Sequence, residues 1–186
     1  MTQDTNGAEG PVTENAELAV GPVPEVESIK TLLEAFEDAT FEVRSYASSD
    51  VTYHAISVPV GDWVAFAETA KAAGYDLFVD LAGIDHFSEA PRFEVVLNLV
   101  SMTESQRIIV STRVPYDDPT VPTVTGVFVG ANFYEREAYD LVGIDFPGHP
   151  DLTRILMPDD WEGHPLRKDY DIGAIPVEFK SGSVDL

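Results

Sequence analysis

Alternation of apolar and polar residues predicts the strands of a sheet. Residues 92–102 (RFEVVLNLVSM) carry an apolar side chain at every second position, the period of a strand with one buried face. Residues 107–114 (RIIVSTRV) form a strand of similar length, and residues 103–105 between them predict a tight hairpin loop. Residues 51–60 (VTYHAISVPV) are rich in β-branched side chains, and residues 75–84 (YDLFVDLAGI) have a similar character. Both segments are predicted strands.

Apolar residues spaced three and four apart predict three helices. The first covers residues 29–36 (IKTLLEAF), and the second covers residues 62–73 and ends at Gly74. The third covers residues 132–142 and ends at Gly143 in a left-handed cap.

The third predicted helix has two distinct faces. Its expected core stripe consists of Ala131, Tyr134, Ala138 and Leu141. A dense polar face is completed by Glu135, Glu137, Tyr139 and Asp140. Arg136 and Asp140 lie one helical turn apart, so they can form an ion pair, and Arg136 can likewise pair with Asn132.

The order of these elements predicts the fold class and three regions. Strand, helix and then an antiparallel meander predict an α+β domain over residues 28–142, in which helices pack on one face of a mixed or antiparallel sheet. Residues 1–27 contain no basic residue and no apolar period, which predicts a disordered acidic arm. Residues 143–186 are expected to form an extended, Pro- and Gly-rich docking segment and a tail. The segment is too apolar to float free, so it must lie on its own domain or on a partner.

Composition removes several classes of function. The chain has no cysteine, which excludes disulfides, a cysteine nucleophile and cysteine-ligated iron–sulfur clusters. A formal net charge of −22 argues against binding to nucleic acid or to an anionic bilayer. No apolar run approaches the length of a membrane span and the N-terminus lacks a signal-peptide pattern, so we expect a cytoplasmic chain.

Candidate chemistry is sparse. No G-x-G-x-x-G or P-loop motif is present. Glu137 and Asp140 could form an acid–base couple, but the neighbouring Arg136 favours an ion-pair lattice. A metal site with nitrogen and oxygen ligands could use His149, Asp151, Asp159 and His164. A histidine beside Gly and Pro in a loop is more typical of a backbone cap or an interface.

The end of the C-terminal segment indicates binding to another protein. Residues 167–169 (RKD) could grip a phosphate, but the adjacent Asp and the acidic chain favour a salt-bridge docking point. Trp161, Leu166 and Arg167 are of the residue types that dominate interface energetics. Pro147, Pro150, Pro158 and Pro165 stiffen the segment, which lowers the entropy lost on docking.

Residues 135–170 read EREAYDLVGIDFPGHPDLTRILMPDDWEGHPLRKDY. This run closely resembles the signature of the C subunit of NADH-quinone oxidoreductase, a small cofactor-free protein in the peripheral arm of respiratory complex I. The order of strands and helix over residues 51–114 is similar to the α+β domain of that family. Residues before the domain and after Asp171 lie outside the resemblance.

The resemblance implies a structural role. The whole complex transfers electrons from NADH through FMN and iron–sulfur clusters to quinone and translocates protons, and this chain is expected to bind none of those cofactors. Expected partners are the other peripheral-arm subunits, chiefly subunits D, B and I, on the cytoplasmic side of the cell membrane. The expected interface residues are Glu135, Arg136, Glu137, Asp140, His149, Arg154, Trp161, Leu166, Arg167, Lys168 and Asp169.

Two alternatives remain at this point. The nearer is an equivalent subunit of a related hydrogenase-type or F420-linked membrane-bound oxidoreductase. The more distant is a stand-alone metal-dependent hydrolase that uses His149, Asp159 and His164.

Overall fold

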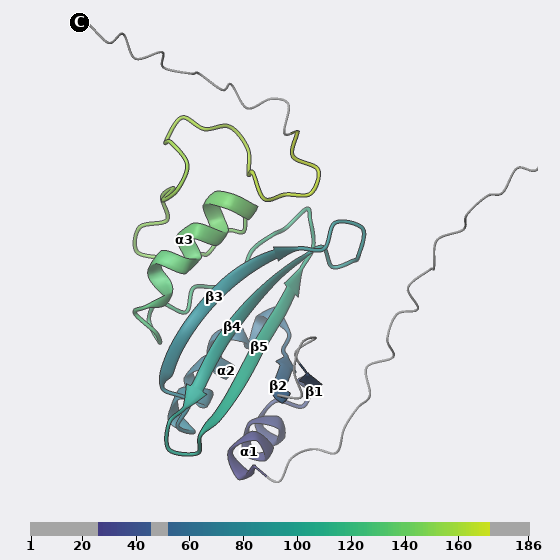
Figure 1. Cartoon of the computed structure of the whole chain (residues 1–186), viewed down its shortest axis with the longest axis vertical. Helices are drawn as coiled ribbons and strands as arrows, with labels where there is room; N and C mark the ends of the chain where they lie inside the picture. The colour runs from purple at the N-terminus through teal and green to yellow at the C-terminus, as the bar shows by residue number, and fades with distance from the viewer. Residues whose placement is uncertain (1–25, 46–51, 172–186) are drawn as a thin grey trace, which may run out of the picture.

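A five-stranded sheet carries the fold, with strand order β1-β2-β5-β4-β3 (Figure 1). The computed structural model describes residues 26–45 and 52–171. In chain order the elements are α1 (Glu27–Ala35), β1 (Thr40–Ser45), β2 (Thr52–Ser57), the 3₁₀ turn η1 (Val60–Asp62), α2 (Trp63–Ala72), β3 (Leu77–Asp85), β4 (Phe93–Ser101), β5 (Gln106–Val114) and α3 (Ala131–Val142). The predicted α+β class is confirmed, and all three predicted helices are present.

Strand β1 is the element that sequence periodicity missed. It lies at the edge of the sheet and pairs with β2 in an antiparallel arrangement, with Val43 opposite His54. Its buried and exposed positions do not alternate, so it lacks the signal of a half-buried strand. Strand β2 pairs with β5 in a parallel arrangement, and this pairing makes the sheet mixed.

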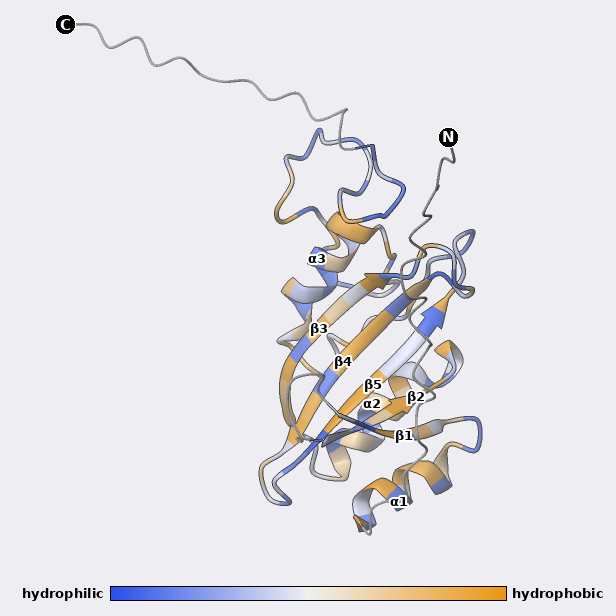
Figure 2. Ribbon diagram, turned by 45° about the vertical axis from the view of Figure 1, so that its right-hand side comes forward, coloured by the Kyte–Doolittle hydropathy of each residue, from blue (hydrophilic) through white to orange (hydrophobic). Residues whose placement is uncertain are grey.

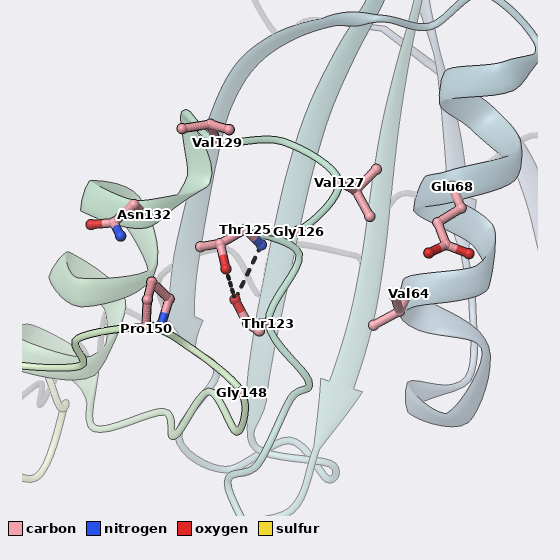
Figure 3. A pocket seen from close by; sticks show the side chains of 10 residues that line it. All are labelled: Val64, Glu68, Thr123, Thr125, Gly126, Val127, Val129, Asn132, Gly148 and Pro150. Carbon is pink, nitrogen blue, oxygen red and sulfur yellow. Dashed lines mark hydrogen bonds between the residues drawn. The ribbon is translucent and has the colours of Figure 1, made fainter.

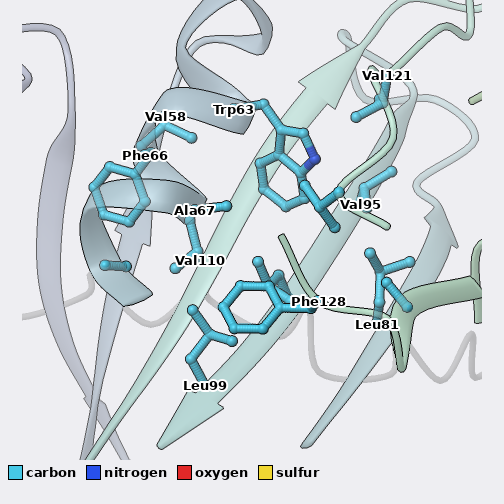
Figure 4. Close-up of a cluster of buried hydrophobic side chains, with 14 of the residues drawn as sticks. Val58, Trp63, Phe66, Ala67, Leu81, Val95, Leu99, Val110, Val121 and Phe128 are labelled. Atoms are coloured by element: carbon cyan, nitrogen blue, oxygen red, sulfur yellow. The ribbon is translucent and has the colours of Figure 1, made fainter. Parts of the chain in front are cut away.

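One apolar core fills the space between the sheet and the helices (Figure 4). Strand β4 alternates as its sequence predicts, and its inward side chains are buried. Helix α2 adds Trp63 and Phe66, and α1 adds Ile29 and Leu32. Each large apolar side chain buried here contributes roughly 2 kcal/mol to stability. The core therefore supplies a rigid base for α3 and for the segment after it.

Helix α3 packs on the same face of the sheet, along its free edge at β3. The approach is close at Gly83, where an added Cβ would lie 3.1 Å from the Cβ of Ala138 and 3.1 Å from Cδ1 of Ile144. A larger residue at position 83 would push α3 and the first residues of the following segment away from the sheet. The small side chains at this contact therefore fix the position of α3.

Both ends of the chain extend beyond the described residues. Of the predicted acidic arm, residues 1–25 lie outside the described residues, and Glu27 begins α1 rather than belonging to the arm. Residues 172–186 also lie outside. In the part of the chain that is described, no helix combines the length and the apolar character needed to cross a bilayer.

Candidate functional site

The segment of residues 143–171 turns back over the C-terminal end of α3 and the neighbouring end of the sheet (Figure 1). It contains no helix or strand, and a single bridge between Asp145 and Thr120 is its one β-type pairing among the described residues. It is not a straight extended strip. Of the two possibilities that its apolar content allowed, the structure places this part of the segment on its own domain.

The carboxylate of Asp140 organises the first half of the segment. Its Oδ2 accepts hydrogen bonds from three consecutive backbone amides, those of Ile155 (3.0 Å), Leu156 (2.8 Å) and Met157 (2.9 Å). Its Oδ1 accepts a 2.6 Å hydrogen bond from Nη1 of Arg154. Because the side chain is completely buried, burial by itself would raise the pKa of Asp140, but these four donors outweigh it and lower the pKa to about 2. The carboxylate is therefore charged and fully bonded within the chain.

The C-terminal carbonyls of α3 are capped by donors from both halves of the segment. The backbone oxygen of Asp140 accepts hydrogen bonds from Arg154 (3.1 Å) and from Nδ1 of His164 (3.0 Å). The amide of Leu166 donates to Leu141 O (2.9 Å). Helix ends leave four carbonyls without intrahelical partners, and the helix dipole favours cations there. The segment meets both needs at this helix end.

Arg167 completes this cap. Its Nε donates to Val142 O at 2.7 Å and its Nη2 donates to Gly143 O at 3.3 Å. Gly143 itself has a φ of 80°, which confirms the predicted left-handed cap. A Cβ at position 143 would collide with the Arg167 guanidinium and the His164 ring, so only glycine permits this contact.

Burial lowers the pKa of His164, an effect that the hydrogen bond to the Asp140 carbonyl partly opposes. The ring is therefore neutral near pH 7. Since a carbonyl can only accept, its Nδ1 must carry the proton.

A triad of charges joins the end of the segment to the sheet. Arg92 binds Asp85 through two hydrogen bonds of 2.7 and 2.8 Å and binds Asp169 through two of 2.9 and 2.7 Å. The side chain of Asp85 is 1% exposed, and it also accepts the backbone amide of Lys168 at 2.8 Å. The hydrogen bonds from Arg92 hold the pKa of Asp85 well below its usual range. The same arginine lowers the pKa of Asp169.

Two aromatic rings lie beside these arginines. The Arg92 guanidinium carbon is 5.1 Å from the centre of the Phe93 ring and 4.9 Å from that of Tyr116. The corresponding distances from Arg167 are 5.1 and 5.7 Å. Cation–π contact of this kind favours a fixed position for both guanidinium groups.

The second buried carboxylate of α3, Glu135, binds the loop that precedes the helix. Its oxygens accept the backbone amide of Val124 (2.8 Å) and the hydroxyl of Thr123 (2.5 Å). Burial raises the pKa of Glu135, and those two hydrogen bonds partly offset the effect. Beside it an open groove of about 460 Å³ lies between α2 and α3, with Thr123 and Asn132 among its walls (Figure 3). Glu135 thus holds one wall of this groove in place.

The structure corrects the predicted faces of α3. Ala131 and Ala138 are buried as expected, but Tyr134 is 36% exposed, while Glu135 and Asp140 of the supposed polar face are completely buried. The predicted ion pair between Arg136 and Asp140 is wrong. Arg136 donates to the backbone oxygens of Thr153 and Arg154 instead. Arg136 binds loop carbonyls and Asp140 binds loop amides, and spacing along the helix could not predict either set of partners.

The candidate metal ligands are not brought together. His149 hydrogen-bonds to Asn132 O through Nε2 and accepts the Asp151 amide at Nδ1, whereas His164 faces the Asp140 carbonyl. Asp159 is exposed. Within the described ranges, no three His, Cys, Asp or Glu side chains are arranged to hold a metal ion. These side chains therefore do not form the hydrolase centre that the sequence allowed. Glu137 is exposed and Asp140 is buried, so they form no acid–base couple in a cleft.

The remaining predicted interface residues divide by exposure. Leu166 is 56% exposed, and Glu137, Lys168 and Asp169 are also exposed. Those that are partly buried are Arg136, His149, Arg154, Trp161 and Arg167. Asp85 and Arg92 bond to the end of the segment but were not singled out from the sequence. Their only local signal is a charged residue at the end of one strand and another just before the next.

Comparison with known proteins identifies relatives of this chain. Residues 56–175, well over half of the chain, match the family model described as "Respiratory-chain NADH dehydrogenase, 30 Kd subunit". The C subunit of NADH-quinone oxidoreductase from Salinispora arenicola is 49% identical over 114 residues, which are 61% of this chain and 46% of that protein. A protein of the same name from Roseiflexus castenholzii is 43% identical over 130 residues, covering 70% of this chain and 75% of that protein. The chain spans about half the length of several curated relatives that it matches.

Two solved structures share the fold. A trypsin-resistant fragment of Nqo5 superposes with a TM-score of 0.59 at 32% identity and covers 67% of this chain and 99% of the fragment. A chain of the membrane-bound sulfane sulfur reductase, described as an archaeal respiratory membrane complex, superposes with a TM-score of 0.68 at 26% identity. That match covers 84% of this chain and 95% of the other.

Proposed function

Because this chain belongs to the family of the 30 Kd subunit of respiratory-chain NADH dehydrogenase, we propose that it is a structural, non-catalytic subunit of a proton-translocating NADH:quinone oxidoreductase. The match of residues 56–175 to the family carries the proposal, because it includes the whole α3 region and the folded-back segment. In the complex, electrons pass from NADH through FMN and iron–sulfur clusters to quinone, and other subunits hold those groups. A chain without cysteine is consistent with this division of labour.

The mechanical contribution of the chain is rigidity. The four carbonyls from Asp140 to Gly143 and the buried carboxylate of Asp140 are all bonded to the segment, so the segment is held by α3 before any partner arrives. A surface that is already ordered loses less entropy on docking. Fixed positions of neighbouring subunits are what electron transfer between separate cofactors requires. The chain accordingly acts as a rigid, preformed contact that fixes the positions of the neighbouring subunits.

We place the interface on the outer side of α3 and the segment. Glu137, Leu166 and Lys168 are exposed there, and Trp161 is partly exposed. Glu135 and Asp140 support this surface from inside the chain. Subunits D, B and I are the proposed partners, and the cytoplasmic side of the cell membrane is the proposed location.

Affinity purification of a tagged chain from the membranes of its source organism tests the proposal. Co-purification of the other subunits, with NADH:quinone activity in the eluate, is the expected result. A chain recovered without any respiratory subunit would contradict it.

A related membrane-bound oxidoreductase is the second candidate. The observation in its favour is the superposition on a chain of the sulfane sulfur reductase complex at a TM-score of 0.68. The electron donor oxidised by the purified assembly separates the two. Turnover with NADH supports the first candidate, and turnover only with another donor supports the second.

A further inference from the structure

The loop of residues 154–163 is closed on itself by one side chain. Arg154 binds Asp140 through Nη1 and donates through Nη2 to the carbonyl of Gly163 at 3.0 Å. The amide of Trp161 donates to Pro158 O at 3.0 Å within the loop. The two ends of the loop are therefore pinned to the same guanidinium group. Compact surface loops whose ends are held close together are frequently functional.

This loop turns apolar side chains outward. Because the amides of residues 155–157 all point at Oδ2 of Asp140, the backbone wraps around the carboxylate. Leu156 is 60% exposed and Ile155 is 37% exposed at this wrap. The buried carboxylate of Asp140 thus holds the backbone of two solvent-exposed aliphatic residues in a fixed position. Exposed apolar residues on a rigid support are typical of a protein interaction site.

The charged side chains within residues 155–162 are all acidic. Asp159, Asp160 and Glu162 are exposed, and no ion pair joins them to a cation anywhere in residues 26–45 and 52–171. Three nearby arginines are already bonded within the chain. Arg154 and Arg167 bind α3, and Arg136 donates to the backbone oxygens of Thr153 and Arg154. In Figure 2 the segment beyond α3 is mostly hydrophilic and is interrupted by short hydrophobic stretches. Residues 155–162 thus expose both aliphatic and acidic side chains, and no basic one.

We propose that residues 155–162 form a docking knob, in which Ile155 and Leu156 enter an apolar pocket of a neighbouring protein and Asp159, Asp160 and Glu162 meet basic side chains around that pocket. The inference rests on the proposed function as a subunit, and it names the chemistry of the partner surface. Arg154 and Arg167, two of the interface residues expected from the sequence, are engaged by α3.

The net charge of the chain favours a basic protein as the partner of the docking knob over three alternatives. A second copy of the chain carries a net charge of −22 and the same acidic loop, so it is repelled. Anionic headgroups and nucleic acid are repelled for the same reason. A basic protein surface with an apolar pocket satisfies both the aliphatic residues and the carboxylates.

Two loop variants with matched controls test the knob in the complex purified from native membranes. Leu156→Glu removes the apolar contact, and Met102→Glu at the far β4–β5 hairpin, where Met102 is 69% exposed, is its control. Changing Asp159, Asp160 and Glu162 together to Lys reverses the sign of the charge on the docking knob. Lys substitutions at exposed Glu34, Glu37 and Asp38 alter the net charge equally.

Each loop variant is expected to recover at least about tenfold less of the neighbouring subunits than wild type, and each control is expected to match wild type. Raising the salt concentration during washing is expected to lower the recovery of the neighbouring subunits with the wild-type chain, because salt screens the charge contacts. Equal recovery with loop and control variants overturns the knob while leaving the proposed function intact. Failure of the wild-type chain to recover any subunit overturns the proposed function instead.

A second measurement does not depend on the stability of these variants. Since the chain contains no cysteine, Leu156→Cys introduces a thiol that is unique within the chain, and a photo-activated cross-linker can be attached to it before the chain is assembled into the complex. A cross-link to a neighbouring subunit at a peptide rich in Lys or Arg is expected, with Met102→Cys as the control position. Cross-linking only within the chain, or to a second copy, would overturn the inference.

Discussion

Asp140 on α3 and Arg154 in the following segment are joined by a 2.6 Å hydrogen bond between a carboxylate with no exposed surface and a guanidinium that is 15% exposed. The pair lies where the helix ends and the segment turns back, and the same carboxylate accepts three backbone amides. Breaking a buried charge pair leaves the remaining charge without compensation. The helix and the segment are therefore energetically one unit.

Asp140→Asn is expected to lower the free energy of unfolding by about 3 kcal/mol, because the amide loses the charge and one of the two acceptor oxygens. Glu137→Gln, on the exposed side of the same helix, is the control and is expected to change it by less than about 0.5 kcal/mol. Urea unfolding of the purified chain measures both. Equal stability of the two variants would contradict the role given to Asp140.

Stability should fall in acid. The hydrogen bonds of Asp140 lower its pKa to about 2 in the folded chain, whereas the unfolded value is about 4. A group with a depressed folded pKa contributes stability above its unfolded pKa and loses that contribution as pH falls toward the folded value. We expect the wild type to lose stability between about pH 4 and pH 2 more steeply than Asp140→Asn. Urea unfolding at several pH values measures the two slopes, and parallel curves would count against the assignment.

Arg92 and Asp169 should differ in importance although they are bonded to each other. Arg92→Ala leaves the buried carboxylate of Asp85 without its bidentate partner and should cost about 3 kcal/mol of stability. Asp169→Asn removes a carboxylate that is 43% exposed and should cost no more than about 1 kcal/mol. Hydrogen exchange of the Lys168 amide, which is bonded to Asp85, reports on this attachment. Exchange that is unchanged in Arg92→Ala would disprove it.

Gly143→Ala should be strongly destabilising. The residue has a φ of 80°, and a Cβ there would meet the Arg167 guanidinium and the His164 ring. We expect a loss of at least about 2 kcal/mol from backbone strain and displacement of the cap. Gly61→Ala is the control, since a Cβ at position 61 meets nothing within 4 Å. Thermal unfolding compares the two, and similar midpoints would refute the argument.

Local patterns in the sequence determined most elements and the family. Apolar residues at every second position were sufficient for β4 and β5, and helical spacing was sufficient for α2 and α3, because both periods depend only on neighbours in the chain. The run over residues 135–170 was specific enough to indicate the family that the comparisons then identified. Strand β1 was not predicted, because an edge strand without a buried face shows no alternation of apolar and polar residues.

Only the tertiary structure decided which charges face inward. Asp140 finds Arg154 fourteen residues away, and Asp85 finds the Lys168 amide 83 residues away. Such pairings depend on where the segment turns back, and no local spacing encodes that. A buried carboxylate and an exposed one look alike in a sequence, and their difference arises from the donors that folding brings within hydrogen-bond distance. For that reason α3 was assigned a polar face, and the structure instead places two buried carboxylates there.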